Sequence, residues 1–156
     1  MKKLALLSLF ITGLVACMNS TQEKKAPDDA TQKGDSTATS SYDPKRGEGK
    51  FNNVVVSTAL DADKAAAGEK VFSVKCSACH KLTSEKLVGP GWKGVTDRHT
   101  AAWIMNFATN TDEMITKDPK AQAMLEICLV RMPNQHLTDE DARNIYEFMR
   151  KNDGLK

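Results

Sequence analysis

The motif Cys76-Ser77-Ala78-Cys79-His80 constrains this chain more than any other feature of its sequence. Two cysteines three residues apart, followed at once by a histidine, form the attachment motif of a c-type haem. At a spacing of one helical turn, the two thiols can add to the two vinyl groups of one porphyrin. The adjacent imidazole is then held beneath the iron. The motif therefore predicts one covalent haem c bound through Cys76 and Cys79, with His80 as an axial ligand.

Two other interpretations of this motif are open but less favoured. Cys76, Cys79, His80 and Cys128 could supply four zinc ligands, although structural zinc sites usually show two well-spaced pairs of ligands. The adjacent positions of Cys79 and His80 are awkward for tetrahedral coordination of one ion. A thioredoxin-like dithiol would need a strand–helix setting, whereas the residues before Cys76 favour a helix.

Residues 1–17 are typical of a bacterial lipoprotein signal peptide. Lys2 and Lys3 precede an apolar run that is too short to span a membrane as a helix. The ending Leu14-Val15-Ala16-Cys17 resembles a lipobox, whose processing leaves a diacylglycerol-modified cysteine at the new N-terminus. We therefore expect cleavage before Cys17 and export on a lipid anchor, facing the periplasm or the cell exterior. An ordinary signal peptide with a chance cysteine is the alternative.

Residues 18–57 are expected to form a flexible polar tether. Polar residues, proline and glycine dominate to about residue 50, and such a composition buries too little apolar surface to offset the entropy of ordering. Residues 51–57 are β-prone and also fit an extended strap packed on the domain. The formal net charge of +2 is carried by Lys2 and Lys3, so the rest of the chain is neutral. This balance gives no indication of nucleic-acid binding.

Residues 58–156 are expected to form an all-α domain. The first helix should run to about Lys75, the third should end near Ile127, and Gly154 should mark the end of the last. Each helix begins after a residue suited to capping: Asp61 or Asp63, Thr100, Asp118 before Pro119, and Thr138 before three acids. Apolar residues at helical spacing on the last helix are Ala142, Ile145, Phe148 and Met149.

The pattern Gly68-x-x-x-Phe72-x-x-x-Cys76-x-x-Cys79-His80 resembles the class I cytochromes c, and the resemblance covers essentially the whole predicted domain. It implies the class I cytochrome c fold, in which the N- and C-terminal helices cross and short helices and loops wrap one haem. The glycine would lie where these two helices cross. Ile145 and Phe148 would be its partners on the last helix.

The stretch from Leu87 to Val95 resembles the Gly-Pro loop that the family places beside the haem histidine. This resemblance implies that the Pro90 carbonyl accepts the remaining N–H of His80. Such a bond fixes the orientation of a ligating histidine and raises its basicity. Trp92 stands where leucine is more usual and should still pack on the haem. Its indole N–H needs a partner, for which a haem propionate is one candidate.

Met132-Pro133-Asn134 resembles the family's distal segment, which implies that the Met132 sulfur is the sixth iron ligand. Three alternatives stay open: a bis-histidine haem using His99 or His136, an iron with no sixth protein ligand, and Met132 as an ordinary core methionine. If they are not ligands, His99 and His136 are expected to be solvated surface residues. Cys128 lies among apolar neighbours and is expected to be a buried, inert thiol.

The resemblance implies a carrier of single electrons between membrane or periplasmic redox enzymes, namely a quinol-oxidising complex and a terminal oxidase or reductase. No acid–base or nucleophile constellation accompanies the haem motif, so we expect neither a small-molecule substrate nor enzymatic activity. One alternative is a haem-based sensor or peroxidase-like enzyme with an open sixth position. Another is an electron donor dedicated to a terminal reductase such as nitrous oxide reductase. A third is a structural lipoprotein without haem.

Basic residues dominate the chain around the haem motif. Between Lys64 and Arg98 there are seven basic residues against three acids. The hypothesis that follows is electrostatic steering of an acidic partner towards the exposed haem edge. The lysines expected to surround this edge are Lys75, Lys81, Lys86 and Lys93.

Overall fold

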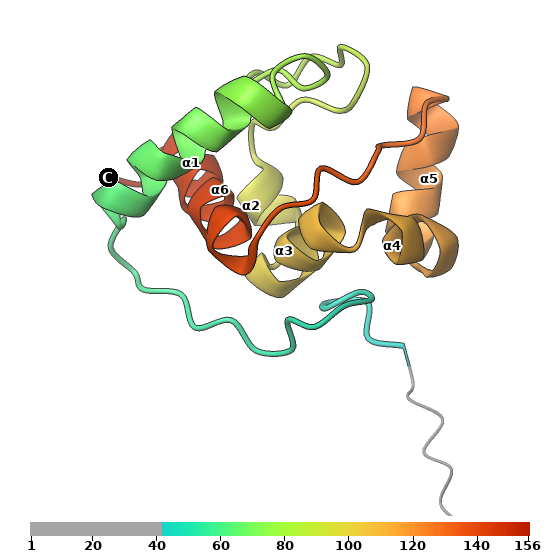
Figure 1. Cartoon of the computed structure of the whole chain (residues 1–156), viewed down its shortest axis with the longest axis horizontal. Coiled ribbons are helices and arrows are strands. Elements are labelled where there is room, and N and C mark those ends of the chain that lie inside the picture. The colour runs from blue at the N-terminus through green and yellow to red at the C-terminus, as the bar shows by residue number, and fades with distance from the viewer. Residues whose placement is uncertain (1–41) are drawn as a thin grey trace, which may run out of the picture. The chain divides into compact units, whose positions relative to one another are not determined.

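The computed structural model describes residues 42–156, in which six helices are joined by loops (Figure 1). The predicted signal peptide, the lipidation site Cys17 and the tether as far as residue 41 lie outside the described residues. Within residues 42–156 there is no β-strand, and no helix is long and apolar enough to cross a membrane. The helices are α1 (Ala62–Lys75), α2 (Val95–Arg98), α3 (Ala101–Thr109), α4 (Thr111–Lys117), α5 (Pro119–Cys128) and α6 (Asp139–Asn152).

Side-chain caps begin the four helices that the sequence predicts. Asp61 accepts a hydrogen bond from the Lys64 amide at the start of α1, and the caps of α3 and α5 act in the same way. Thr138 and Asp141 form a reciprocal capping box at the start of α6. The remaining helices, α2 and α4, are not predicted from the sequence. Neither has a side-chain cap, and both are short.

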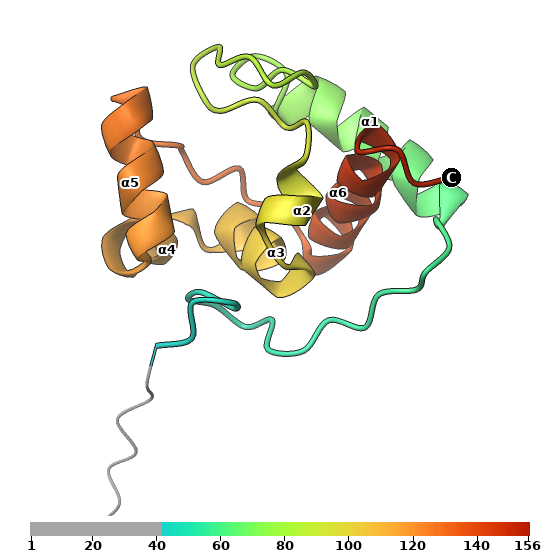
Figure 2. The same cartoon turned by 180° about the vertical axis from the view of Figure 1, so that it is seen from behind.

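Helix α1 crosses α6, and the two lie side by side in both views of the ribbon (Figures 1 and 2). A Cβ atom added at Gly68 would lie 2.0 Å from the backbone oxygen of Asn144 on α6. One turn further along α1, the ring of Phe72 lies 5.5 Å from that of Phe148. The predicted apolar face of α6 is buried here. The all-α fold and the crossing at Gly68 are therefore confirmed.

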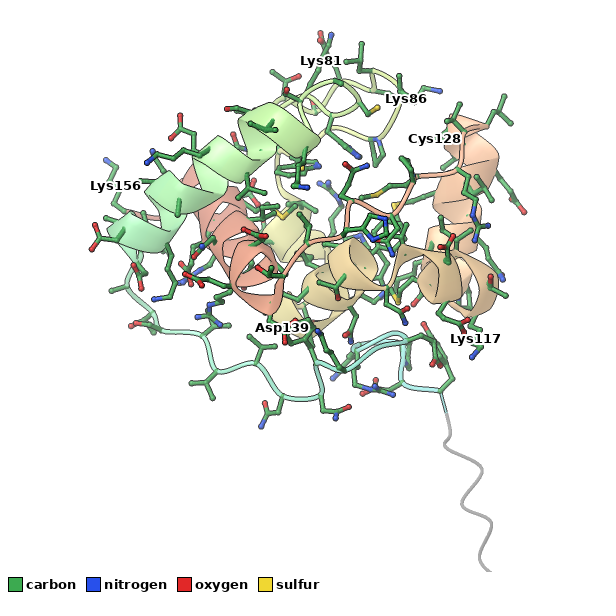
Figure 3. The ribbon with its side chains drawn as sticks, in the orientation of Figure 1. Lys81, Lys86, Lys117, Cys128, Asp139 and Lys156 are labelled. Carbon is green, nitrogen blue, oxygen red and sulfur yellow. The ribbon has the colours of Figure 1, made fainter. Side chains whose placement is uncertain are left out.

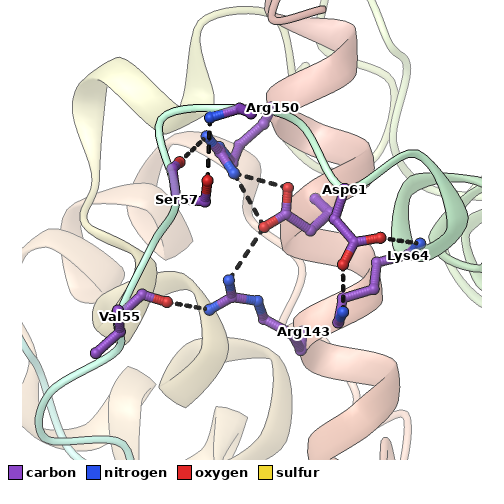
Figure 4. Close-up of polar contacts among 8 residues, drawn as sticks. Val55, Ser57, Asp61, Lys64, Arg143 and Arg150 are labelled. Carbon is purple, nitrogen blue, oxygen red and sulfur yellow. Dashed lines mark hydrogen bonds and ion pairs between the residues drawn. The ribbon is translucent and has the colours of Figure 1, made fainter.

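A buried ion-pair network ties α6 to the segment before α1 (Figure 4). Glu147 is only 1% exposed, and its carboxylate lies 2.7 Å from Arg150 and 3.2 Å from Arg143. Arg143 and Arg150 also donate hydrogen bonds to backbone carbonyls of Val55 and Ser57. The two arginines thus neutralise a buried carboxylate and hold the preceding segment against α6.

Residues 42–57 form a strap that begins with a turn, in which the amides of Arg46 and Gly47 donate to the Asp43 carbonyl, and then runs along the helices to α1 (Figure 1). The fully buried Asn106 on α3 exchanges hydrogen bonds of 2.9 Å with the backbone N–H and carbonyl of Phe51, and it donates to the Arg46 carbonyl at 3.0 Å. Tyr42 donates its hydroxyl to Asp118. These contacts bind residues 42–51 to α3 and to Asp118, and residues 51–57 lie as the packed strap that was one of the two expectations for them.

Candidate haem site

A cavity of about 680 Å³ is lined by residues of the α1–α2 loop, helices α3 and α5 and the segment between α5 and α6. Its volume falls within the range of ligand and cofactor sites. The site residues predicted from the sequence all lie on its wall: Cys76, Cys79, His80, Pro90, Trp92 and Met132. Folding thus brings together residues that are up to 56 positions apart in the chain.

The end of α1 places both predicted attachment thiols on the cavity wall. Cys76 is the C-cap of α1, and its carbonyl accepts hydrogen bonds from the amides of Cys79 (3.0 Å) and His80 (2.9 Å). This tight turn presents all three residues on the wall of one cavity. Cys76 is buried, and burial raises the pKa of its thiol to about 11. Neither cysteine forms a disulfide, so both sulfurs are free to bond a cofactor.

A hydrogen bond to the proximal loop fixes the ring of His80. Its Nδ1 lies 2.9 Å from the Pro90 carbonyl oxygen. A carbonyl can only accept, so Nδ1 carries the proton and Nε2 is left with a lone pair for a metal. Burial lowers the pKa of His80, and the bond to Pro90 opposes this effect. The ring is therefore held in the neutral form that binds iron.

Two glycines allow the proximal loop to pack closely, Gly89 against this histidine and Gly91 against the backbone of residues 83–85. A Cβ at Gly89 would lie 2.4 Å from Cε1 of His80, and one at Gly91 would lie 2.2 Å from the Thr83 carbonyl oxygen. The Gly89 amide also donates to the Cys79 carbonyl at 2.8 Å. A larger residue at position 89 would push the loop away from the histidine, and one at position 91 would push it away from the backbone of residues 83–85.

Trp92 lies between the helical core and the cavity. Its ring centroid is 4.8 Å from that of Phe72 and 5.6 Å from that of His80. The side chain is buried, and its backbone amide donates to the Lys81 carbonyl at 2.9 Å. The indole can thus pack on a flat cofactor while also closing the α1–α6 core.

Met132 reaches the cavity from the segment between α5 and α6. This segment leaves α5 through Leu129, which has a left-handed backbone conformation (φ 60°), and Met132 is half-buried on the wall. Pro133 and Leu137 line the wall on the same segment. His136, which was an alternative ligand, is instead exposed and is not part of the wall. Its expected surface position is confirmed.

Two expectations about the remaining site residues are wrong. His99 is not a solvated histidine: it is half-buried on the cavity wall and its ring stacks on Trp103 at 3.9 Å. Cys128 is half-buried and lines the cavity, so it is not sealed in the core. Figure 3 shows it at the end of α5. Its apolar neighbours Ile127 and Leu129 are 67% and 83% exposed, and Ile127 lines the cavity beside Cys128.

The chemistry of the wall suits a haem. Its surface is mostly apolar, as a porphyrin ring requires. The charged side chains on it are all basic, which suits the two propionate carboxylates at the edge of a haem. They are Lys75, Lys86, Lys93, Arg98, Lys120 and Arg131. Sulfur and imidazole donors stand on the same wall, so the residues present fit an iron porphyrin.

The zinc alternative finds no support in the geometry. Across the part of the chain that the structure describes, no three His, Cys, Asp or Glu side chains come close enough together to hold a metal ion.

The family model described as Cytochrome c matches residues 65–153, which is more than half of the chain. This chain belongs to the cytochrome c family. A solved cytochrome c from Rhodothermus marinus is 32% identical with a TM-score of 0.65, and the match covers 67% of this chain and 90% of that one. An engineered form of the Rhodothermus protein, Rma TDE, is 31% identical with a TM-score of 0.67. That match covers 71% of this chain and 98% of that one.

A curated relative, the cytochrome c-type cyt cy of Rhodobacter capsulatus, is 44% identical over 48 residues. This match spans 31% of the present chain and only 24% of the relative. The family match and the Rhodothermus structures show that this cytochrome c is a mono-haem, class I protein. It binds a c-type haem covalently and takes part in haem-based electron transfer.

Proposed function

We propose that this protein carries single electrons on one haem c whose iron is held by His80 and Met132. Cys76 and Cys79 would form the thioether links, and Pro90 would orient the histidine. The observation that carries the proposal is that a histidine with its Nδ1 bonded to Pro90 shares one cavity with the Met132 thioether. When bound, the haem supplies an iron that alternates between the ferrous and ferric states.

The two axial residues give the site the properties of a carrier. The thioether of Met132 suits the softer ferrous state and so raises the reduction potential. With nitrogen on one side and sulfur on the other, no position is left for a substrate. The apolar wall keeps water from the ligands, and the rigid loop around His80 limits movement when an electron arrives or leaves.

The sixth ligand is tested by Met132→Leu, with Met124→Leu as the matched control. Met124 is also a half-buried methionine on the cavity wall, so both changes replace a thioether with a hydrocarbon in the same cavity. In purified holoprotein, Met132→Leu should lower the midpoint potential, remove the sulfur-to-iron charge-transfer band of the ferric form and allow the ferrous form to bind carbon monoxide. Met124→Leu should do none of these. An unchanged band and potential in Met132→Leu would exclude sulfur ligation by this residue.

The spin state and carbon monoxide binding of the wild-type protein distinguish an electron carrier from a sensor or peroxidase-like enzyme. An electron carrier with both axial positions filled should be low-spin and should bind carbon monoxide poorly. High-spin ferric haem or ready carbon monoxide binding would favour the sensor or enzyme instead.

The proposed partners are redox proteins with acidic docking surfaces, such as a quinol-oxidising complex and a terminal oxidase or a reductase such as nitrous oxide reductase. Support comes from Lys75, Lys86 and Lys93, which line the haem cavity. Figure 3 shows Lys81 and Lys86 on the α1–α2 loop. Lys81, however, is paired with Glu85 at 2.8 Å and is not part of the wall. We therefore assign the steering charge to the three wall lysines.

The proposed location is a bacterial membrane, on the side that faces the periplasm or the cell exterior, with the chain anchored by lipid on Cys17. The signal pattern of residues 1–17 supports this location. Expression of Cys17→Ser in a bacterial host tests it, because the variant should move from the membrane fraction to the soluble fraction. Retention of the variant in the membrane would refute anchoring through Cys17.

A further inference from the structure

His99 lies on the haem cavity wall but has no part in the proposed ligation. Its ring stacks on Trp103, with centroids 3.9 Å apart and planes 12° from parallel. Trp103 is itself fixed, because its indole N–H donates to the buried Asp118 at 2.8 Å and its ring also stacks with Phe107. His99 is therefore held at a fixed position on the wall.

The two nitrogens of the His99 ring have different surroundings. Nδ1 is buried and has no hydrogen-bond partner. A buried N–H without an acceptor is destabilising, whereas an Nε2–H can find an acceptor in the cavity, so we assign the proton of the neutral ring to Nε2. This tautomer makes Nε2 a hydrogen-bond donor. Unlike Nδ1, Nε2 is not a buried atom without a hydrogen-bond partner.

The charges around His99 favour an anionic partner. Burial lowers the pKa of His99, and the charges of Lys120 on α5 and Arg98 on α2 lower it further, to about 4. Asp118 is the opposing charge, but its carboxylate already accepts from Trp103, Tyr42 and the Ala121 amide. The ring thus stays neutral at pH 7, and both cations also line the cavity. Arg98 donates to the Gly91 and Lys93 carbonyls and Lys120 donates to the Pro44 carbonyl, so no carboxylate among the described residues neutralises either charge there.

We propose that the Nε2–H of His99 donates a hydrogen bond to one propionate carboxylate of the haem, with Arg98 and Lys120 flanking it. Two independent observations carry this assignment: a fixed ring on the cavity wall, and a buried Nδ1 that leaves the proton on Nε2. The inference deepens the proposed function because it names a residue that tunes the potential of the haem. It depends on the haem but not on Met132 as a ligand.

A hydrogen bond to the propionate changes the reduction potential of the iron by changing the negative charge near it. A propionate carboxylate stabilises the ferric state, which carries one more positive charge than the ferrous state. A donated hydrogen bond spreads the carboxylate charge and weakens this effect. Loss of the donor should therefore lower the midpoint potential, whereas a replacement that keeps a donor should preserve it. His99 is in this sense a positioning residue.

The test compares His99→Leu with His99→Gln in purified holoprotein. Glutamine can place an amide N–H near the position of Nε2, whereas leucine cannot donate. The midpoint potential of His99→Leu should shift downward, and that of His99→Gln should stay near the wild-type value. His136→Asn is the control, because His136 is exposed and its left-handed backbone (φ 51°) tolerates asparagine. It should leave the potential unchanged.

A direct measurement keeps the proposal testable if His99→Leu fails to fold. In the diamagnetic ferrous wild-type protein, nuclear Overhauser effects should connect the His99 ring protons to the propionate methylene protons. Their absence, or equal potentials in all three variants and the wild type, would overturn the proposal. The sulfur-to-iron band tests only ligation by Met132. Whether Met132→Leu loses or keeps this band, the result for the His99 hydrogen bond stands on its own measurements.

Discussion

The Nδ1 atom of His80 lies 2.9 Å from the carbonyl oxygen of Pro90, and Gly89 makes this approach possible. A methyl group at Gly89 would lie 2.4 Å from the imidazole. The loop and the histidine therefore fit together only when position 89 has no side chain.

Gly89→Ala should displace His80 or the loop. We expect a loss of about 2 kcal/mol in the unfolding free energy of the holoprotein, in the range of other overpacked sites, together with a changed visible spectrum. Denaturant unfolding followed by haem absorbance measures both. A variant with wild-type stability and spectrum would contradict the tight packing of this loop on the histidine.

Gly68→Ala should force α1 away from α6. The added carbon would lie 2.0 Å from the Asn144 oxygen, and the gain of about 1 kcal/mol in helix propensity should not offset this overlap. We expect a net loss of about 2 kcal/mol or more, measured by thermal or denaturant unfolding. Ala66→Ser adds one atom to the exposed face of the same helix and should change stability by about 0.5 kcal/mol or less. Equal effects of the two substitutions would argue against a close helix crossing.

Glu147→Gln should leave Arg143 and Arg150 without their shared carboxylate. Removal of one partner from a buried ion pair typically costs about 3–5 kcal/mol. The matched control is Glu69→Gln, which breaks the exposed pair between Glu69 of α1 and Lys151 of α6 and should cost less than about 1 kcal/mol. Denaturant unfolding of both variants gives the comparison, and a small effect at position 147 would show that the arginines find other partners.

Asp118→Ala should destabilise the protein by about 3 kcal/mol, because three donors lose one buried acceptor. Tyr42→Phe removes only one of these donors and should cost about 1 kcal/mol. Burial and the Asp118 carboxylate raise the pKa of Tyr42, so its hydroxyl remains a donor at all ordinary pH values. If Tyr42→Phe proved as damaging as Asp118→Ala, the strap would contribute more than this single hydrogen bond explains.

Electron transfer to an acidic redox partner should slow as ionic strength rises, because salt screens the wall lysines over about 8 Å at physiological concentration. At low ionic strength, Lys86→Gln should reduce the association rate by about twofold or more. Lys70→Gln removes the same charge from a residue outside the cavity wall and should have a smaller effect. Stopped-flow kinetics over a salt series tests both. Rates independent of salt would refute electrostatic steering.

Local sequence signals predicted most of the fold. The caps of α1, α3, α5 and α6 were visible because each is a hydrogen bond within four residues of chain. Helix α2 was not visible, because Asp153, near the far end of the chain, accepts hydrogen bonds from the amides of Gly94 and Thr96. Helix α4 follows α3 after the single residue Asn110, with no capping side chain to mark its start.

Site residues that belong to short sequence motifs could be predicted. Site residues whose positions depend on contacts between distant parts of the chain could not. The haem motif and the proximal and distal segments were recognised from short patterns. The position of His99 depends on Trp103, which Asp118 orients from another helix. Likewise, the sequence shows that the neighbours of Cys128 are apolar, which predicted a buried thiol, but it does not show that α5 ends at a cavity. The polar composition of residues 42–50 hid the contacts that Asn106 makes with the strap.

The strap also has a mechanical consequence. Tension applied to the chain ahead of Tyr42 first meets the bond to Asp118, then the bonds of Asn106, and then the arginine bonds to Val55 and Ser57. These links bear the load in series before any force reaches the start of α1. A pulling force on the preceding chain therefore reaches α1, the helix that leads to the haem cysteines, only after these contacts have broken.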